Sequence, residues 1–140
     1  MPIHRQPAAL AAFTAVAALL CAAPVLAKPT AIAAAVADPA RAEGNRALDE
    51  GRKPSEILAF SGLKAGDVVA DYQAGGGYYS ELIADVVGPK GRVYALTQPN
   101  FYKAAEWDKL RAAHPNLYPV VTPAQAMVLA PASVDMIFTH

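Results

Sequence analysis

The sequence predicts an α/β domain built on a parallel sheet, and two observations support this prediction. Short apolar runs that suit buried strands alternate along the chain with segments whose apolar residues recur at helical spacing. Three consecutive glycines follow the first of these runs, at a position where parallel sheets bind ligands. Strands that alternate with helices form a parallel sheet, and the crossover helices are expected to cover both of its faces.

Four segments are predicted to be the strands of this sheet. Residues 68–70 form the first apolar run and residues 93–96 form the second. Residues 117–121 and 134–139 follow, with a loop at 122–132 between them. Short apolar runs bounded by turn residues are typical of strands that are buried on both faces.

Four further segments are predicted to be helices: 39–48, 53–61, 79–87 and 99–114. The third has the clearest periodicity, with apolar residues on one face and charged residues on the other. The first is expected to begin at Asp38 and Pro39, because a capping residue followed by proline favours a helix start. Of Tyr78 and Tyr79, one is expected in the core and one on the surface, and Trp107 is expected to point inward.

Residues 1–27 have the layout of a secretory signal peptide. Arg5 precedes an uncharged stretch at 8–23, and the segment ends in small residues of the kind that a signal peptidase reads. Pro24 interrupts the apolar stretch, which argues against a retained membrane anchor. The chain is therefore expected to be exported, to the periplasm or beyond, without a stable membrane anchor after cleavage. Residues 28–50 are expected to form a flexible or helical lead-in, flexible at its alanine-rich start.

Composition and charge narrow the possible partners. Lys and Arg number 12, Asp and Glu also number 12, and the net charge is +0, so the excess of basic residues that nucleic-acid binding requires is missing. The single cysteine, Cys21, lies in the predicted signal, which excludes a disulfide framework from the mature chain. The histidines, His4, His114 and His140, have no metal-ligand spacing, so no metal site is expected. A small molecule is the expected partner.

The glycine cluster is the strongest functional signal in the chain. It lies between the first predicted strand, closed by Asp71, and the helix that follows. Glycines in this position allow the backbone to approach a ligand, and free amides at a helix start favour a negatively charged group. The pattern Gly75-x-Gly77-x-x-Ser80 loosely fits the dinucleotide fingerprint, which leaves a nicotinamide cofactor open as one interpretation.

The same loop, Asp71-x-x-Ala74-Gly75-Gly76-Gly77, resembles the first motif of class I S-adenosylmethionine-dependent methyltransferases. Three flanking segments are also similar to that family: the lead into the motif at 63–71, the turn into the second strand at 88–95, and the fourth strand at 133–138. Residues 52–60 resemble a bacterial subgroup of predicted exported methyltransferases. The resemblance covers residues 51–140.

The resemblance implies a Rossmann-like parallel sheet of the class I methyltransferase type. The family's seven strands have the order 3-2-1-4-5-7-6, and only strands 1–4 are present here, so residues 51–140 are expected to be the N-terminal part of such a domain. The implied cofactor is S-adenosyl-L-methionine. The implied cofactor-binding residues are Asp71, Ala74, Gly75, Gly76, Gly77 and Thr97. Gln73 replaces the motif's first glycine, and Thr97 or Gln98 stands where the family usually has an acid that binds the ribose.

The resemblance implies the function of an S-adenosylmethionine-dependent methyltransferase, a transferase acting on a small-molecule substrate. The implied reaction is direct methyl transfer, and the catalytic residues are not assigned. The alternative is an exported, non-enzymatic α/β binding domain that has lost the cofactor. An exported location favours this alternative, because the cofactor is made in the cytoplasm.

Overall fold

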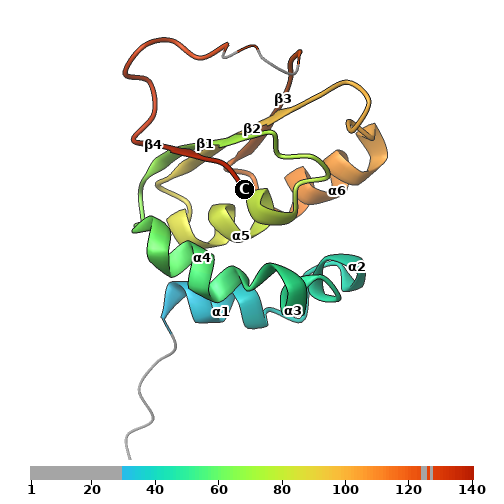
Figure 1. Ribbon diagram of the computed structural model, residues 1–140, viewed down its shortest axis with the longest axis vertical. Helices are drawn as coiled ribbons and strands as arrows, with labels where there is room; N and C mark the ends of the chain where they lie inside the picture. Colours follow the sequence, from blue (N-terminus) through green and yellow to red (C-terminus); the bar gives the residue numbers. More distant parts are fainter. Residues whose placement is uncertain (1–29, 124–125, 127) are drawn as a thin grey trace, which may run out of the picture.

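The computed structural model describes residues 30–123, 126 and 128–140. The predicted signal segment, including Cys21, lies outside the described residues. The helices are α1 Ala31–Ala37, α2 Glu43–Arg46, α3 Asp49–Arg52, α4 Pro54–Ser61, α5 Tyr78–Val87 and α6 Ala104–Ala113 (Figure 1). None of the helices in this described part is long and apolar enough to cross a membrane.

The strands form one four-stranded parallel sheet in the order β3-β2-β1-β4. Their bounds are β1 Val68–Tyr72, β2 Arg92–Thr97, β3 Leu117–Val121 and β4 Met136–Phe138. This architecture confirms the predicted α/β fold, and the order is the one expected for the first four strands of the family that the glycine loop resembles. The strand predicted at 134–139 is shorter in the structure, where β4 covers only Met136–Phe138. Just before it, the side chain of Asp135 accepts the Val68 amide at 2.8 Å.

The helices lie on one side of the sheet (Figure 1). The prediction that helices cover both faces is therefore wrong for the part of the chain that the structure describes. The opposite face carries the paired rings of Tyr94 and Tyr118, whose centroids are 5.7 Å apart. Tyr118 on β3 and Ile137 on β4, the two edge strands, remain exposed there as large apolar side chains.

Helix α5 is buried between the sheet and the N-terminal helices. Leu82 and Ile83 are fully buried, as the periodicity predicts. Tyr78 and Tyr79 are both buried, so the prediction that one of them is a surface residue is wrong. Helices α1 and α3 supply the second covering layer, and the Tyr78 hydroxyl donates to Asp49 Oδ1 of α3 at 2.6 Å.

The N-terminal segment is helical where a flexible start was predicted. Helix α1 is capped by Thr30, whose hydroxyl accepts the Ala33 amide, and it places Ala35 in the core. Of the helix predicted at 39–48, only the one-turn α2 forms. Asp38 instead accepts the Ala40 amide at 2.7 Å in a turn, and the chain then forms the one-turn helices α2 and α3.

Helix α6 is shorter than predicted but buries the expected residue. The chain first makes a turn in which the Gln98 carbonyl accepts the amides of Phe101 and Tyr102. The helix itself begins at Ala104, and Trp107 is fully buried. Trp107 therefore anchors α6 in the core, as the sequence predicts.

A buried ion pair joins the N-terminal helices to α5. Arg41, in the turn after α1, donates to Glu81 Oε1 at 3.0 Å, and both side chains are only 2% exposed. The same guanidinium forms a fork with both Asp49 oxygens at 2.8 and 2.9 Å and also donates to the Val36 carbonyl. Burial alone would lower the pKa of Arg41, but its bonds to Asp49 and Glu81 outweigh burial and raise it. Arg41 is therefore held in its charged form.

Removing Arg41 is expected to destabilise the fold strongly. Arg41→Met leaves the Glu81 carboxylate buried without its cation, and breaking a buried pair in this way costs about 3–5 kcal/mol. The measurement is the free energy of unfolding in urea. The matched control is Lys103→Met, which breaks the exposed Lys103–Glu106 pair and is expected to cost less than about 1 kcal/mol. Equal losses in the two variants would contradict a stabilising role for the buried pair.

Candidate functional site

The glycine loop, residues 73–77, leaves the carboxyl end of β1 and leads into α5. Its backbone is fixed to the neighbouring strand, because the Ala74 amide donates to the Leu96 carbonyl at 2.9 Å. Gln73, Gly75 and Gly77 all adopt positive φ, at 61°, 56° and 87°. Gln73 thus keeps the left-handed backbone that suits glycine, and its side chain is exposed.

The last two glycines of the cluster have different surroundings. A Cβ on Gly77 would lie 2.7 Å from Leu110 Cδ1 and 3.0 Å from Trp107 Cη2, so this glycine allows α6 to pack against the loop. A Cβ on Gly76 would meet nothing within 4 Å. Gly77 is therefore a packing requirement, whereas Gly76 presents open backbone at the edge of the sheet.

Thr97 supports the loop from the end of β2. Its side chain is fully buried, and its hydroxyl donates to the Gly75 carbonyl at 2.9 Å. The amide of Thr122, which follows β3, donates to the Thr97 carbonyl at 2.9 Å and continues the same edge. This gives Thr97 a structural role that the sequence did not indicate, and its contact with a cofactor stays a prediction.

Asp71 lies beneath the loop as a fully buried carboxyl group. Its Oδ2 accepts the Ser80 hydroxyl at 2.5 Å, which joins the end of β1 to the first turn of α5. Among the described residues, Oδ1 has no hydrogen-bond partner, and the nearest cationic candidate is His140 Nε2 at 3.9 Å. Burial raises the pKa of Asp71 to about 7, against a smaller lowering by the Ser80 hydrogen bond.

All six residues predicted to bind a cofactor lie at this edge of the sheet: Asp71, Ala74, Gly75, Gly76, Gly77 and Thr97. The structure adds His140 to the same edge. No sequence signal connected His140 with Asp71, because their proximity depends on the pairing of β1 with β4. Among the described residues, no group of three or more His, Cys, Asp or Glu side chains could hold a metal ion.

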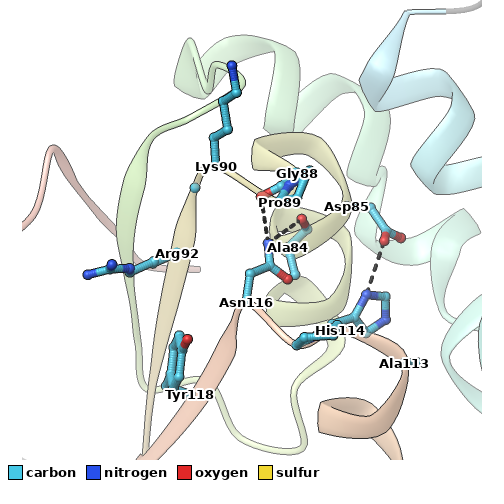
Figure 2. Close-up of a pocket in the computed structure, with 12 residues that line it drawn as sticks. Ala84, Asp85, Gly88, Pro89, Lys90, Arg92, Ala113, His114, Asn116 and Tyr118 are labelled. Carbon is cyan, nitrogen blue, oxygen red and sulfur yellow. Dashed lines mark hydrogen bonds and ion pairs between the residues drawn. The ribbon is translucent and has the colours of Figure 1, made fainter.

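A pocket of about 520 Å³ lies at the opposite, amino end of the sheet (Figure 2). Asn116 fixes one wall by donating to the carbonyls of Ala84 and Gly88, both at 2.9 Å. The side chains of Lys90 and Arg92, which line the pocket, point in different directions in Figure 2 and do not converge on one position. The polar contacts here join α5 to the start of β3, and they indicate a structural role for this pocket.

A second cavity, of about 650 Å³, lies between the turn after α1 and helices α5 and α6. Its charged groups include Arg41 and Glu81, which are already paired with each other. Gly76 is the single residue of the glycine loop that lines it. This cavity therefore flanks the candidate site without containing its other residues.

Gly77→Ala is expected to destabilise the protein. The added methyl group would clash with α6, and the φ of 87° is unfavourable for alanine, which together predict a loss of about 1–3 kcal/mol. Urea unfolding measures this change. The control is Gly51→Ala in α3, where a Cβ would meet nothing within 4 Å, and its stability is expected to change by less than about 1 kcal/mol. An unaltered unfolding midpoint for Gly77→Ala would refute the packing role.

The His114–Asp85 pair beside the pocket predicts a pH-dependent stability. The Nδ1–Oδ1 distance is 3.1 Å, and this hydrogen bond raises the pKa of His114 above 6.5 while burial partly opposes it. A raised folded-state pKa gives stability that is fully present below pH 6.5 and is lost as the pH rises through the folded value. The stability difference between wild type and His114→Gln should therefore shrink over that rise. A difference that grows or stays constant in urea unfolding across this range would count against the pair.

Comparisons with known proteins identify the fold. A crystal structure described as a SAM-dependent methyltransferase from Aquifex aeolicus superposes with a TM-score of 0.56 and 27% identity, covering 69% of this chain and 54% of that one. A protein-L-isoaspartate O-methyltransferase gives a TM-score of 0.53 and 24% identity, covering 61% and 27%. No family model matches the sequence. No curated protein matches it either.

These likenesses show that the chain has the class I methyltransferase fold, which confirms the fold predicted from the glycine motif. The chain spans about half the length of the Aquifex protein. The resemblance to an exported subgroup stays a prediction.

Proposed function

We propose that this chain is the cofactor-binding part of an S-adenosylmethionine-dependent methyltransferase. The observation that carries the proposal is the conformation of the glycine loop. The Thr97 hydroxyl and the side chains of α6 fix its backbone, and a Cβ on Gly76 would meet nothing within 4 Å. The 27% identity to the Aquifex methyltransferase, on the same fold, supports this assignment over a nicotinamide cofactor. The predicted signal peptide adds export to the proposal.

The residues of the loop fit the amino-acid end of this cofactor. Within the described chain, the amides of Gly75 and Gly76 donate to no backbone carbonyl. Such amides near the start of α5 suit a carboxylate, and the missing side chain of Gly76 allows close approach. When bound, the cofactor supplies a methyl group on a positively charged sulfur. The loop's part is to bind the amino-acid end of the cofactor and thereby orient the methyl group.

The end of β2 offers neutral groups to the rest of the cofactor. Thr97 is engaged with Gly75, so the half-buried Gln98 beside it is the residue available to meet ribose hydroxyls. An amide forms weaker hydrogen bonds to hydroxyls than a carboxylate does. The proposed site therefore holds the cofactor chiefly through its loop, with a smaller contribution from β2.

Isothermal titration calorimetry on the full chain tests the cofactor. We expect saturable binding of S-adenosylmethionine and S-adenosylhomocysteine, and no heat with NAD⁺. Binding of NAD⁺ alone would replace the proposal by the dinucleotide interpretation. A folded chain that binds none of the three would favour the alternative of a binding domain that has lost the cofactor.

Gly76→Val is expected to separate binding from folding. A Cβ at this position would meet nothing within 4 Å, so the thermal midpoint is expected to stay near that of wild type. It would occupy the space that a ligand needs, and we expect the Kd for S-adenosylhomocysteine to rise at least about tenfold, equivalent to about 1.4 kcal/mol. Gly51→Ala, outside the loop, is the control and should bind normally. Unchanged affinity in Gly76→Val would exclude the loop as the binding site.

A further inference from the structure

Arg52, the last residue of α3, carries a positive charge that is not neutralised within the described part of the chain. The residue is exposed, and its guanidinium forms no ion pair with the carboxylates that the structure describes. The guanidinium carbon lies 4.5 Å from the ring centroid of Tyr78, a distance at which a cation–π contact forms. Arg41 differs, because Asp49 and Glu81 neutralise its charge. Arg52 is therefore available to a negatively charged ligand.

The backbone of Arg52 and the ring that its guanidinium contacts are both held in place. The Arg52 carbonyl accepts the Tyr79 hydroxyl at 2.9 Å, and the Arg52 amide donates to the Leu48 carbonyl at 3.0 Å. Tyr78 is buried, and its hydroxyl donates to Asp49 Oδ1. A group that is held in this way loses less conformational freedom on binding than a mobile one. The guanidinium is thus preorganised for a ligand.

Arg52 lies next to the end of the sheet at which open α/β proteins bind their ligands. Tyr79, whose hydroxyl bonds to the Arg52 carbonyl, lies in the first turn of α5, directly after the glycine loop. The Tyr79 ring packs against the ring of His140, which follows β4, with centroids 4.5 Å apart. Burial and, to a smaller extent, the charge of Arg52 lower the pKa of His140. The guanidinium therefore lies within electrostatic reach of the carboxyl end of β4.

The carboxylates that bear on this region are engaged elsewhere. Asp49 and Asp71 both act electrostatically on Tyr79. Asp49 is paired with Arg41, and Asp71 is fully buried with its Oδ2 bonded to the Ser80 hydroxyl. Neither forms an ion pair with Arg52. A negatively charged group from outside the protein would therefore reach Arg52 without displacing an existing pair.

We propose, on the basis of the proposed function, that the methyl acceptor carries a carboxylate or phosphate group and that Arg52 binds this group. A guanidinium donates two parallel hydrogen bonds to such an oxyanion, which fixes the orientation of the ligand as well as its position. The carboxylate of the cofactor is assigned to the amides of Gly75 and Gly76, which leaves Arg52 for the acceptor. Arg52 then determines substrate specificity, because a neutral analogue of the acceptor loses this contact.

Binding of small anions to the full chain tests this proposal without an acceptor. Inorganic phosphate and acetate are the probes, and acetamide, which resembles acetate but is uncharged, is the control. NMR follows the Arg52 Nε–H signal and the His140 imidazole signals at constant ionic strength in chloride. We expect saturable shifts with at least one anion and none with acetamide. The anion with the lower Kd identifies the group that the acceptor carries, and absence of binding by both anions overturns the proposal.

A pair of arginine variants locates the site. Arg52→Gln is expected to raise the Kd for the anion at least about tenfold and to raise the pKa of His140, because an opposing positive charge is removed. The matched control is Arg46→Gln, which removes the same charge from an exposed position in α2 and should change neither quantity. An unchanged Kd in Arg52→Gln, or equal losses in the two variants, contradicts a site at Arg52.

Arg52→Lys provides a second variant if Arg52→Gln does not fold. It keeps the positive charge but loses the paired donors of the guanidinium. We expect the Kd for the anion to rise, by a smaller factor than in Arg52→Gln. A Kd equal to that of wild type would contradict binding through paired hydrogen bonds.

Calorimetry with S-adenosylhomocysteine separates this proposal from the proposed function. Arg52→Gln should keep the wild-type Kd for S-adenosylhomocysteine, and the small anions should not displace it. A raised Kd in Arg52→Gln would assign Arg52 to the cofactor and overturn its role toward the acceptor. Failure of wild type to bind S-adenosylhomocysteine would reject the proposed function alone, because anion binding at Arg52 is measured without cofactor.

Discussion

The burial of α5 on two sides is the constraint on which the rest of the structure depends. One side faces the sheet and the other faces α1 and α3, so polar groups on this helix need partners within the protein. Glu81 finds its partner in Arg41, and Ser80 finds its partner in Asp71. The first pair holds the N-terminal helices in place, and the second holds the glycine loop against the end of β1. One helix thus connects the stability of the N-terminal layer to the geometry of the candidate site.

The elements that the sequence predicts well are those whose signal is local. Strands β1, β2 and β3 are short apolar runs, and α5 has a continuous apolar stripe that ends at Gly88. The alanine-rich α1 has no such stripe, because Ala35 is buried by contact with a helix more than forty residues away. Tyr78 and Tyr79 show the same limit. Periodicity assigns one face of a helix to the core, and a second covering layer buries the other face as well.

The candidate site likewise has one part that the local sequence predicts and another that depends on contacts distant in the sequence. The glycine loop was predictable because glycines at the end of a strand form a local pattern with a known purpose. The hydrogen bond from Thr97 to Gly75 and the approach of His140 to Asp71 arise from strand pairing over 22 and 69 residues, respectively. Sequence spacing carries no information about such contacts. The hydrogen bond that positions the loop, and the approach of His140 to Asp71, therefore emerged only with the sheet register.

Gln73 shows why the loop keeps its shape although the first glycine of the motif is absent. A non-glycine residue at a φ of 61° costs about 1 kcal/mol, and the loop must recover this from its other contacts. Those contacts come from the neighbouring strand and from α6. They are the Leu96 carbonyl, the Thr97 hydroxyl and the α6 side chains that fill the space beside Gly77. A Cβ on Gly76, by contrast, would meet nothing within 4 Å, so this part of the loop presents open backbone. The loop conformation is thus set by the sheet and α6 before any ligand binds, which is the preorganisation that a cofactor site requires.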